Sequence, residues 1–151
     1  MASLSWGKPT VEWAPSTAGA PGTVWKAFPE IQEDSTKLTP TAGTKKEATQ
    51  EGGTTVAVRY GANKYSAELK LFVKKDDTKP FEDIDGVVDG EYSIRLTPED
   101  TTCQGWIMDC AKVHCEEDYS AADGTFWKYV FDGLKPATGN IVKPYTKPTG
   151  A

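Results

Sequence analysis

The sequence has few of the groups on which catalysis and metal binding usually depend. Its 151 residues include one histidine, His114, and three cysteines, Cys103, Cys110 and Cys115. Acid–base chemistry near neutral pH would therefore have to use His114 or a carboxyl group whose pKa is strongly shifted. No serine or cysteine sits in a recognisable nucleophile turn. We therefore expect no catalytic residues and no enzyme activity.

The three cysteines are too few and too closely clustered for a disulfide framework. A zinc site would need closely spaced pairs of ligands set on turns. Cys110, His114 and Cys115 instead fall within one expected strand, in which neighbouring side chains point to opposite faces. We expect free thiols that pack as small apolar groups, with no metal and no cofactor.

Long apolar runs are also missing. No stretch approaches the roughly 18 apolar residues of a membrane span, and the start, MASLSWGKPTVEW, lacks the apolar run of a signal peptide. We expect a protein that stays in the cytoplasm in which it is made, without a membrane partner. The net charge is -5 and the pI about 4.9, so the field of the protein weakly repels nucleic acid and specific DNA or RNA reading is not expected.

Aromatic residues, in contrast, are plentiful. Five Trp, six Tyr and five Phe supply large apolar area in a chain of otherwise modest hydrophobicity. The length suits one domain, residues 1–151. Such a composition favours a thin, aromatic-rich core between β-strands.

The first half of the chain predicts strands separated by extended segments. Scattered Pro and Gly make residues 1–22 an N-terminal arm with a short strand, and VWKAFPEI, residues 24–31, reads as an edge strand because of its proline. Apolar residues alternate over residues 54–60 and again over residues 64–73. We expect both runs to be core strands, joined as a hairpin by a turn at residues 61–63.

The second half predicts two more hairpins and one helix. Asp89-Gly90 has the residues of a two-residue turn, and a third turn is expected at residues 122–124, before the strand FWKYVFDGL. Thr97, Pro98 and Asp100 match a helix cap, a first helical position and an acid in the first turn, so a short helix is expected to about Gln104. The prolines of the C-terminal extension, residues 136–151, exclude a helix or central strand. The expected fold is mainly β, an antiparallel β-sandwich or barrel with one short helix.

One segment does not fit a compact domain. From Thr39 to Gly53 the chain has no large apolar side chain, and loops longer than about 12 residues are usually disordered or functional. We interpret residues 39–55 as an assembly loop that reaches neighbouring subunits. The candidate contact residues in this loop are Thr39, Thr41, Lys45, Lys46, Glu47, Gln50, Glu51, Gly52 and Gly53. In the two terminal arms the candidates are Trp6, Trp13 and Tyr145.

Three stretches together resemble the major tail tube proteins of tailed bacteriophages: KLTPTAGTKKEATQEGGTTVAVRYGANKYSAELKLFV, IRLTPED and KYVFDGLKP. The resemblance covers residues 37–136. It implies a β sandwich or barrel with a flanking helix, whose copies form hexameric rings that stack into a tube, with the long loop on the adjacent ring. The implied partners are other copies and other tail proteins, and the implied location is the virion tail, after synthesis in the host cytoplasm.

An acidic tube wall is consistent with that role. DNA passes without specific binding where the wall repels phosphates, whereas basic residues would hold it by releasing counterions. Two other hypotheses remain open. One is a secreted or surface carbohydrate-binding sandwich that uses Trp6, Trp13 and Trp25 as a platform. The other is a different virion component, such as a head-tail connector or decoration protein.

Overall fold

A computed structural model describes residues 7–32 and 35–147, and this part of the chain contains strands and no helix. It therefore has no helix long and apolar enough to cross a membrane. The strands are β1 (Thr10–Thr17), β2 (Ala20–Pro21), β3 (Lys26–Ala27), β4 (Lys37–Thr41), β5 (Lys45–Thr49), β6 (Thr55–Tyr60), β7 (Lys64–Phe72), β8 (Asp83–Ile84), β9 (Val87–Thr97), β10 (Gly105–Ser120), β11 (Gly124–Gly133) and β12 (Val142–Tyr145).

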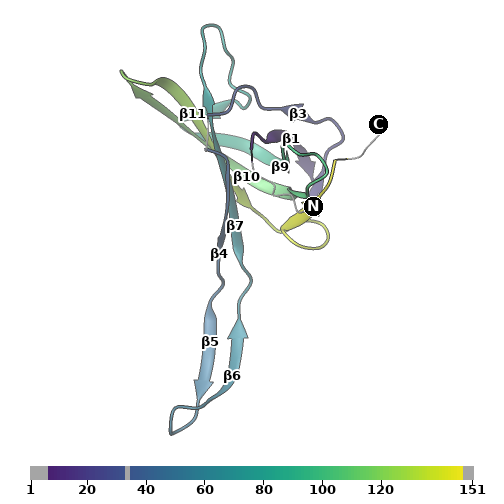
Figure 1. Cartoon of the computed structure of the whole chain (residues 1–151), viewed down its shortest axis with the longest axis vertical. Coiled ribbons are helices and arrows are strands. Elements are labelled where there is room, and N and C mark those ends of the chain that lie inside the picture. Colours follow the sequence, from purple (N-terminus) through teal and green to yellow (C-terminus); the bar gives the residue numbers. More distant parts are fainter. Residues whose placement is uncertain (1–6, 33–34, 148–151) are drawn as a thin grey trace.

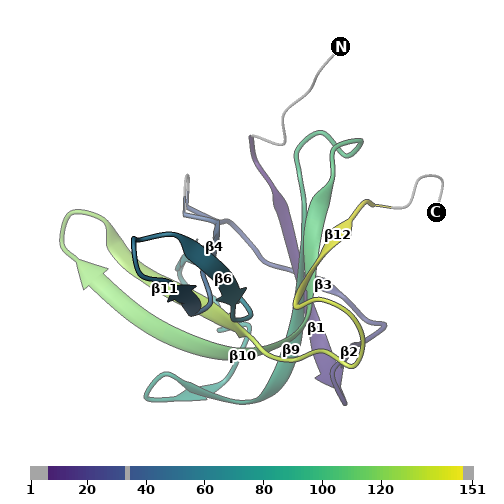
Figure 2. The ribbon, with the colours of Figure 1, turned by 90° about the horizontal axis from the view of Figure 1, so that it is seen from below.

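Most strands form one antiparallel sheet in the order β2-β1-β9-β10-β11-β7-β4, with β3 on β1, β8 on β9 and β12 on β10. The sheet curls into a half-barrel, which Figure 2 shows from one end. The prediction of a mainly β, antiparallel fold is confirmed. The predicted short helix is wrong.

The core fills the inside of this curl. Alternate residues of β7 and β11 face it, and Leu71, Tyr129 and Phe131 are fully buried. Phe81 lies at the centre of the aromatic group, with its ring centroid 4.4 Å from that of Trp13 and 5.4 Å from that of Tyr129. Tilted and edge-on ring contacts of this kind add to the stability from area burial alone. The expected aromatic core is thus present.

A single extended segment bridges the open side of the half-barrel. At one edge β3 pairs with β1, and the Phe28 amide donates to the Val11 carbonyl at 2.9 Å. At the other edge Ile31 bridges to Leu71, and the Gln32 amide donates to the Lys70 carbonyl at 2.9 Å. The edge strand expected over residues 24–31 is therefore reduced to β3, followed by a bridging stretch that contains a proline.

The helix expected after Thr97 is a tight turn in the structure. Thr97 still pairs with Thr10 as part of β9, and β10 begins at Gly105, so only residues 98–104 remain for the connection. The Asp100 carboxylate accepts hydrogen bonds from the Thr102 amide at 3.0 Å and hydroxyl at 2.6 Å. The predicted cap, Thr97, is instead the last residue of β9, and the side chain that closes the turn is that of Asp100.

Two predicted turns have different outcomes. The chain passes straight through Asp89-Gly90 in β9, where the ladder with β10 shifts register, and turns instead at Asp85-Gly86 between β8 and β9. Residues 85–90 contain two Asp-Gly pairs, and only the pairing of β9 with β10 shows which of the two forms the turn. The third turn is confirmed, because residues 121–123 connect β10 to β11 and Ser120 pairs with Gly124.

The hairpin expected at residues 61–63 is wrong. β6 pairs with β5, and β7 pairs with β4, so the chain continues in one direction from β6 into β7. The turn of this hairpin lies at residues 50–54 instead. The result is one long ribbon that leaves the half-barrel at one end (Figure 1).

The terminal arms are partly built into the sheet. The short strand expected in the N-terminal arm is β1, which pairs with β9 along six residues from Thr10 to Pro15. β12 of the C-terminal extension pairs with β10, and its Lys143 ammonium contacts the buried carboxylate of Asp109. Pro144 is exposed in that strand, where no outer neighbour among the described residues needs its missing amide.

Candidate interaction surface

The ribbon, defined here as residues 45–60, consists of β5, β6 and the turn between them. The turn is closed by the Gln50 amide, which donates to the Thr54 carbonyl at 3.0 Å, and by the Gly53 amide, which donates to the Gln50 carbonyl at 3.1 Å. Every residue of the ribbon is exposed. Figure 1 shows it extending along the long axis of the molecule, away from the half-barrel.

One face of the ribbon carries what we call the apolar stripe, Val56, Val58 and Tyr60. Alternate residues of a strand share a face, and these three side chains are 62%, 45% and 69% exposed. Residues directly opposite on a paired strand share that face, which places Lys45 and Glu47 beside the stripe, 2.6 Å apart as an ion pair. Exposed apolar patches rimmed by polar residues mark interaction sites. The expectation that these three residues are buried is wrong.

The stripe is exposed because no other segment within residues 7–32 and 35–147 covers it. Its partner strand, β5, has the sequence KKEAT, and the core of the half-barrel lies beyond the start of β7. A two-stranded hairpin alone in water is marginally stable. The ribbon therefore exposes apolar surface that a partner could cover, and such a contact would stabilise the hairpin.

The root of the ribbon is tightly packed. The Gly61 amide donates to the Thr44 carbonyl at 2.7 Å, and the Asn63 side-chain oxygen accepts from the Gly43 amide at 3.2 Å. A Cβ atom on Gly43 would lie 2.2 Å from the Gly61 carbonyl oxygen, so only glycine allows this approach. The root thereby fixes the direction in which the ribbon leaves the sheet.

The predicted contact residues divide into two groups. The ribbon brings together Lys45, Lys46, Glu47, Gln50, Glu51, Gly52 and Gly53. Thr39 and Thr41 are exposed on β4, the outermost strand of the sheet. The apolar stripe was not among the predicted contact residues, although two glycines at the Glu51-Gly52-Gly53 turn, between segments of similar length, were a signal for a hairpin there.

Three of the aromatic residues predicted as arm contacts or as a sugar-binding platform, Trp13, Trp25 and Tyr145, lie in the described part of the chain and pack within the fold. Trp13 is 8% exposed and belongs to the core, so its assignment to an exposed arm is wrong. The Arg95 guanidinium lies 5.0 Å from the ring centroid of Tyr145 and 4.1 Å from that of Trp25, so both rings stack on a cation. Trp6 lies outside the described residues.

The thiols are buried or paired within the fold. Cys110 and Cys115 are buried, and burial raises the pKa of both thiols, which keeps them protonated. The Cys110 thiol lies 3.0 Å from the Glu91 carboxylate, to which it donates. Within residues 7–32 and 35–147, no three His, Cys, Asp or Glu side chains are arranged to hold a metal ion.

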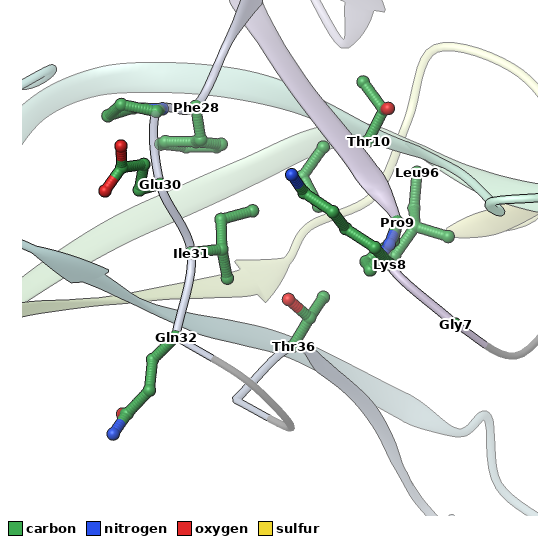
Figure 3. Close-up of a pocket in the computed structure, with 12 residues that line it drawn as sticks. Gly7, Lys8, Pro9, Thr10, Phe28, Glu30, Ile31, Gln32, Thr36 and Leu96 are labelled. Carbon is green, nitrogen blue, oxygen red and sulfur yellow. The ribbon is translucent and has the colours of Figure 1, made fainter.

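A cavity of about 830 Å³ opens beside the bridging segment (Figure 3). Phe28, Ile31 and Leu96 give it apolar walls, and Lys8 and Glu30 are its charged residues. The Glu30 carboxylate is paired with Lys74 outside the cavity. The lining contains no Cys, His or Asp.

No protein-family model matches the chain, and no curated protein matches it significantly. The ribbon and its apolar stripe are therefore the features from which we infer a function.

Proposed function

We propose that the protein is a structural virion protein, the major tail tube subunit of a tailed bacteriophage. In this proposal its copies form hexameric rings that stack into a tube, and DNA passes through the channel without specific binding. The observation that carries the proposal is the protruding ribbon with its uncovered apolar stripe.

The exposed apolar surface of the stripe provides a favourable free energy for assembly. Full burial of a Val or similar side chain contributes roughly 1.5–3 kcal/mol, and the stripe residues retain 45–69% of their surface for a partner. A partner also supplies the order that a two-stranded hairpin lacks by itself. Another copy of the chain is available wherever the protein is made in quantity, and repeated contacts of this kind build an assembly.

The half-barrel supports ring formation in a second way. β4 is the outermost strand and pairs with β7 alone among the described strands. Its exposed Thr39 and Thr41 lie on an edge that a neighbouring subunit would cover, and closure of a ring removes such edges. The net charge of -5 suits a wall from which DNA phosphates are repelled.

The two alternatives predict different behaviour. A carbohydrate-binding module needs free aromatic faces, whereas Trp13 is buried and Trp25 stacks on Arg95. A head-tail connector or decoration protein would also have a use for the ribbon, but would not form an open-ended tube. Quenching of Trp fluorescence by soluble glycans would favour the first alternative, and discrete rings without tubes would favour the second.

The test replaces the ribbon without disturbing its root. Because the Gly61 amide already bonds to the Thr44 carbonyl, residues 45–60 can be replaced by Asn-Gly, the preferred two-residue hairpin turn. We expect concentrated wild-type protein to form tubes with a central channel in negative-stain micrographs. We expect the replacement to keep the wild-type circular dichroism spectrum and thermal stability but to form no tubes. Tubes from the replacement, or none from the wild type, would contradict the proposal.

A further inference from the structure

The end of the molecule opposite the ribbon also carries exposed apolar side chains, those of Ile84 and Val87. These residues are 79% and 59% exposed and pair across the turn between β8 and β9. β7 begins beside the ribbon and runs away from it, so the segment that follows Phe72 lies at the far end of the long axis (Figure 1). We call residues 82–89 the acidic corner.

Charge is distributed unequally between the two ends. Residues 37–64, which contain the ribbon, have five basic and two acidic side chains, a net charge of +3. At the far end, residues 74–89 and 116–123 together have three basic and ten acidic side chains, a net charge of -7. Two ends of opposite charge, each with exposed apolar residues, are complementary surfaces.

The acidic corner is held rigidly. Asp85 and Gly86 both have positive φ angles, 50° and 88°, as a two-residue hairpin turn requires. The Asp83 carboxylate accepts hydrogen bonds from the Gly86 amide at 2.9 Å and from Lys79 at 3.0 Å. A Cβ on Gly86 would lie 2.6 Å from the Cys115 carbonyl oxygen, so the turn packs directly on β10. A preformed surface of this kind loses little entropy on binding.

We propose, building on the assembly function above, that the apolar stripe of one copy docks on Ile84 and Val87 of the next copy. Lys45 beside the stripe then faces Asp89, which lies on the same side of β9 as Val87. The contact joins different surfaces on the two copies, at opposite ends of the molecule. Such a head-to-tail contact does not close into a dimer and propagates along an axis, as a stacked tube requires.

The first test is cross-linking, with oxidised glutathione as the oxidant, between variants that each carry one added cysteine in a Cys103→Ser background, where the remaining thiols, Cys110 and Cys115, are buried. We expect Val58→Cys protein mixed with Ile84→Cys protein to give a mixed disulfide dimer in at least fivefold higher yield than Ala57→Cys mixed with Ile84→Cys. Ala57 lies on the opposite face of the same strand, so it is a matched control. Equal yields from the two mixtures would overturn the assigned contact.

The second test exchanges charges. Lys45→Glu and Asp89→Lys should each raise the concentration needed for assembly at low salt at least fivefold, and the two together in one chain should restore it. A double variant that still needs the higher concentration for assembly would overturn the pairing of Lys45 with Asp89.

The outcomes separate the docking contact from the assembly function. If neither the cross-link nor the charge exchange has an effect while replacement of the ribbon abolishes tubes, the acidic corner is not the surface that binds the stripe, and the assembly function stands. If the mixed disulfide forms but tubes never appear, the docking contact stands and the tube function fails.

Discussion

Conversion of the apolar stripe to threonine is the most informative perturbation of assembly. Val56→Thr, Val58→Thr and Tyr60→Thr together keep side chains that favour strands, so the ribbon keeps its local preference. All three sites are exposed, and exposed substitutions usually change the free energy of unfolding by no more than about 0.5 kcal/mol. The folded monomer should therefore be unaffected.

The magnitude follows from the exposed fractions. With 62%, 45% and 69% of their surface uncovered, the three side chains have about half of the roughly 1.5–3 kcal/mol of full burial still to gain, or about 3 kcal/mol together. Each 1.4 kcal/mol is a factor of about ten in an equilibrium constant. Loss of the stripe should raise the concentration needed for assembly by about 100-fold.

Sedimentation velocity over a concentration series measures this threshold. The matched control is Ala48→Ser with Ala57→Ser, which changes polarity on the opposite face of the ribbon and should leave the threshold within about twofold of wild type. A triple threonine variant that assembles at the wild-type concentration would refute the reasoning. So would a control variant that fails equally.

Three further predictions concern charge and stability. Added salt should raise the assembly threshold severalfold, because screening weakens attraction between the oppositely charged ends, and a lower threshold in light scattering would contradict this. The hydrogen bond from Lys79 lowers the pKa of the Asp83 carboxyl group below its ordinary value of 3.8, so the ionised carboxylate stabilises the fold fully above pH 3.8 and this stabilisation is lost as the pH falls through the lowered pKa. Asp83→Asn should therefore make Tm depend less on pH in the acid range, and an unchanged pH dependence of Tm would contradict this role of Asp83. Lys143→Met leaves the 9%-exposed Asp109 side chain unpaired and should cost about 2–4 kcal/mol in denaturant unfolding, whereas a loss below about 0.5 kcal/mol would show that the pair contributes little.

Alternation in sequence predicted the interior strands well. In the runs predicted as strands β7 and β11, alternate residues such as Leu69 and Tyr129 are buried, and the turn at residues 121–123 lies where expected. These elements were predictable because a run of apolar residues at period two, bounded by turn residues, is typical of a strand. Period alone, however, does not say what covers a face.

The errors share that cause. Val56, Val58 and Tyr60 alternate as core residues do, but their partner is the polar strand β5, and the pairing is visible only once β4 and β7 are placed together. Residues 61–63 have the composition of a turn, but they connect β6 to β7 without reversing the direction of the chain. The predicted contact loop, residues 39–55, contains β5 and the turn of the ribbon, whereas the apolar residues of β6 were assigned to the core.

Amide hydrogen exchange of residues 45–60 across a concentration series tests the central claim most directly. In dilute protein the ribbon amides should exchange close to the rate of an unfolded chain, because a lone two-stranded hairpin opens readily. In concentrated protein they should become protected together with residues 82–89, while the core strands β7, β10 and β11 stay protected throughout. Ribbon amides that exchange at the same rate at every concentration would contradict the claim that a second copy completes this surface.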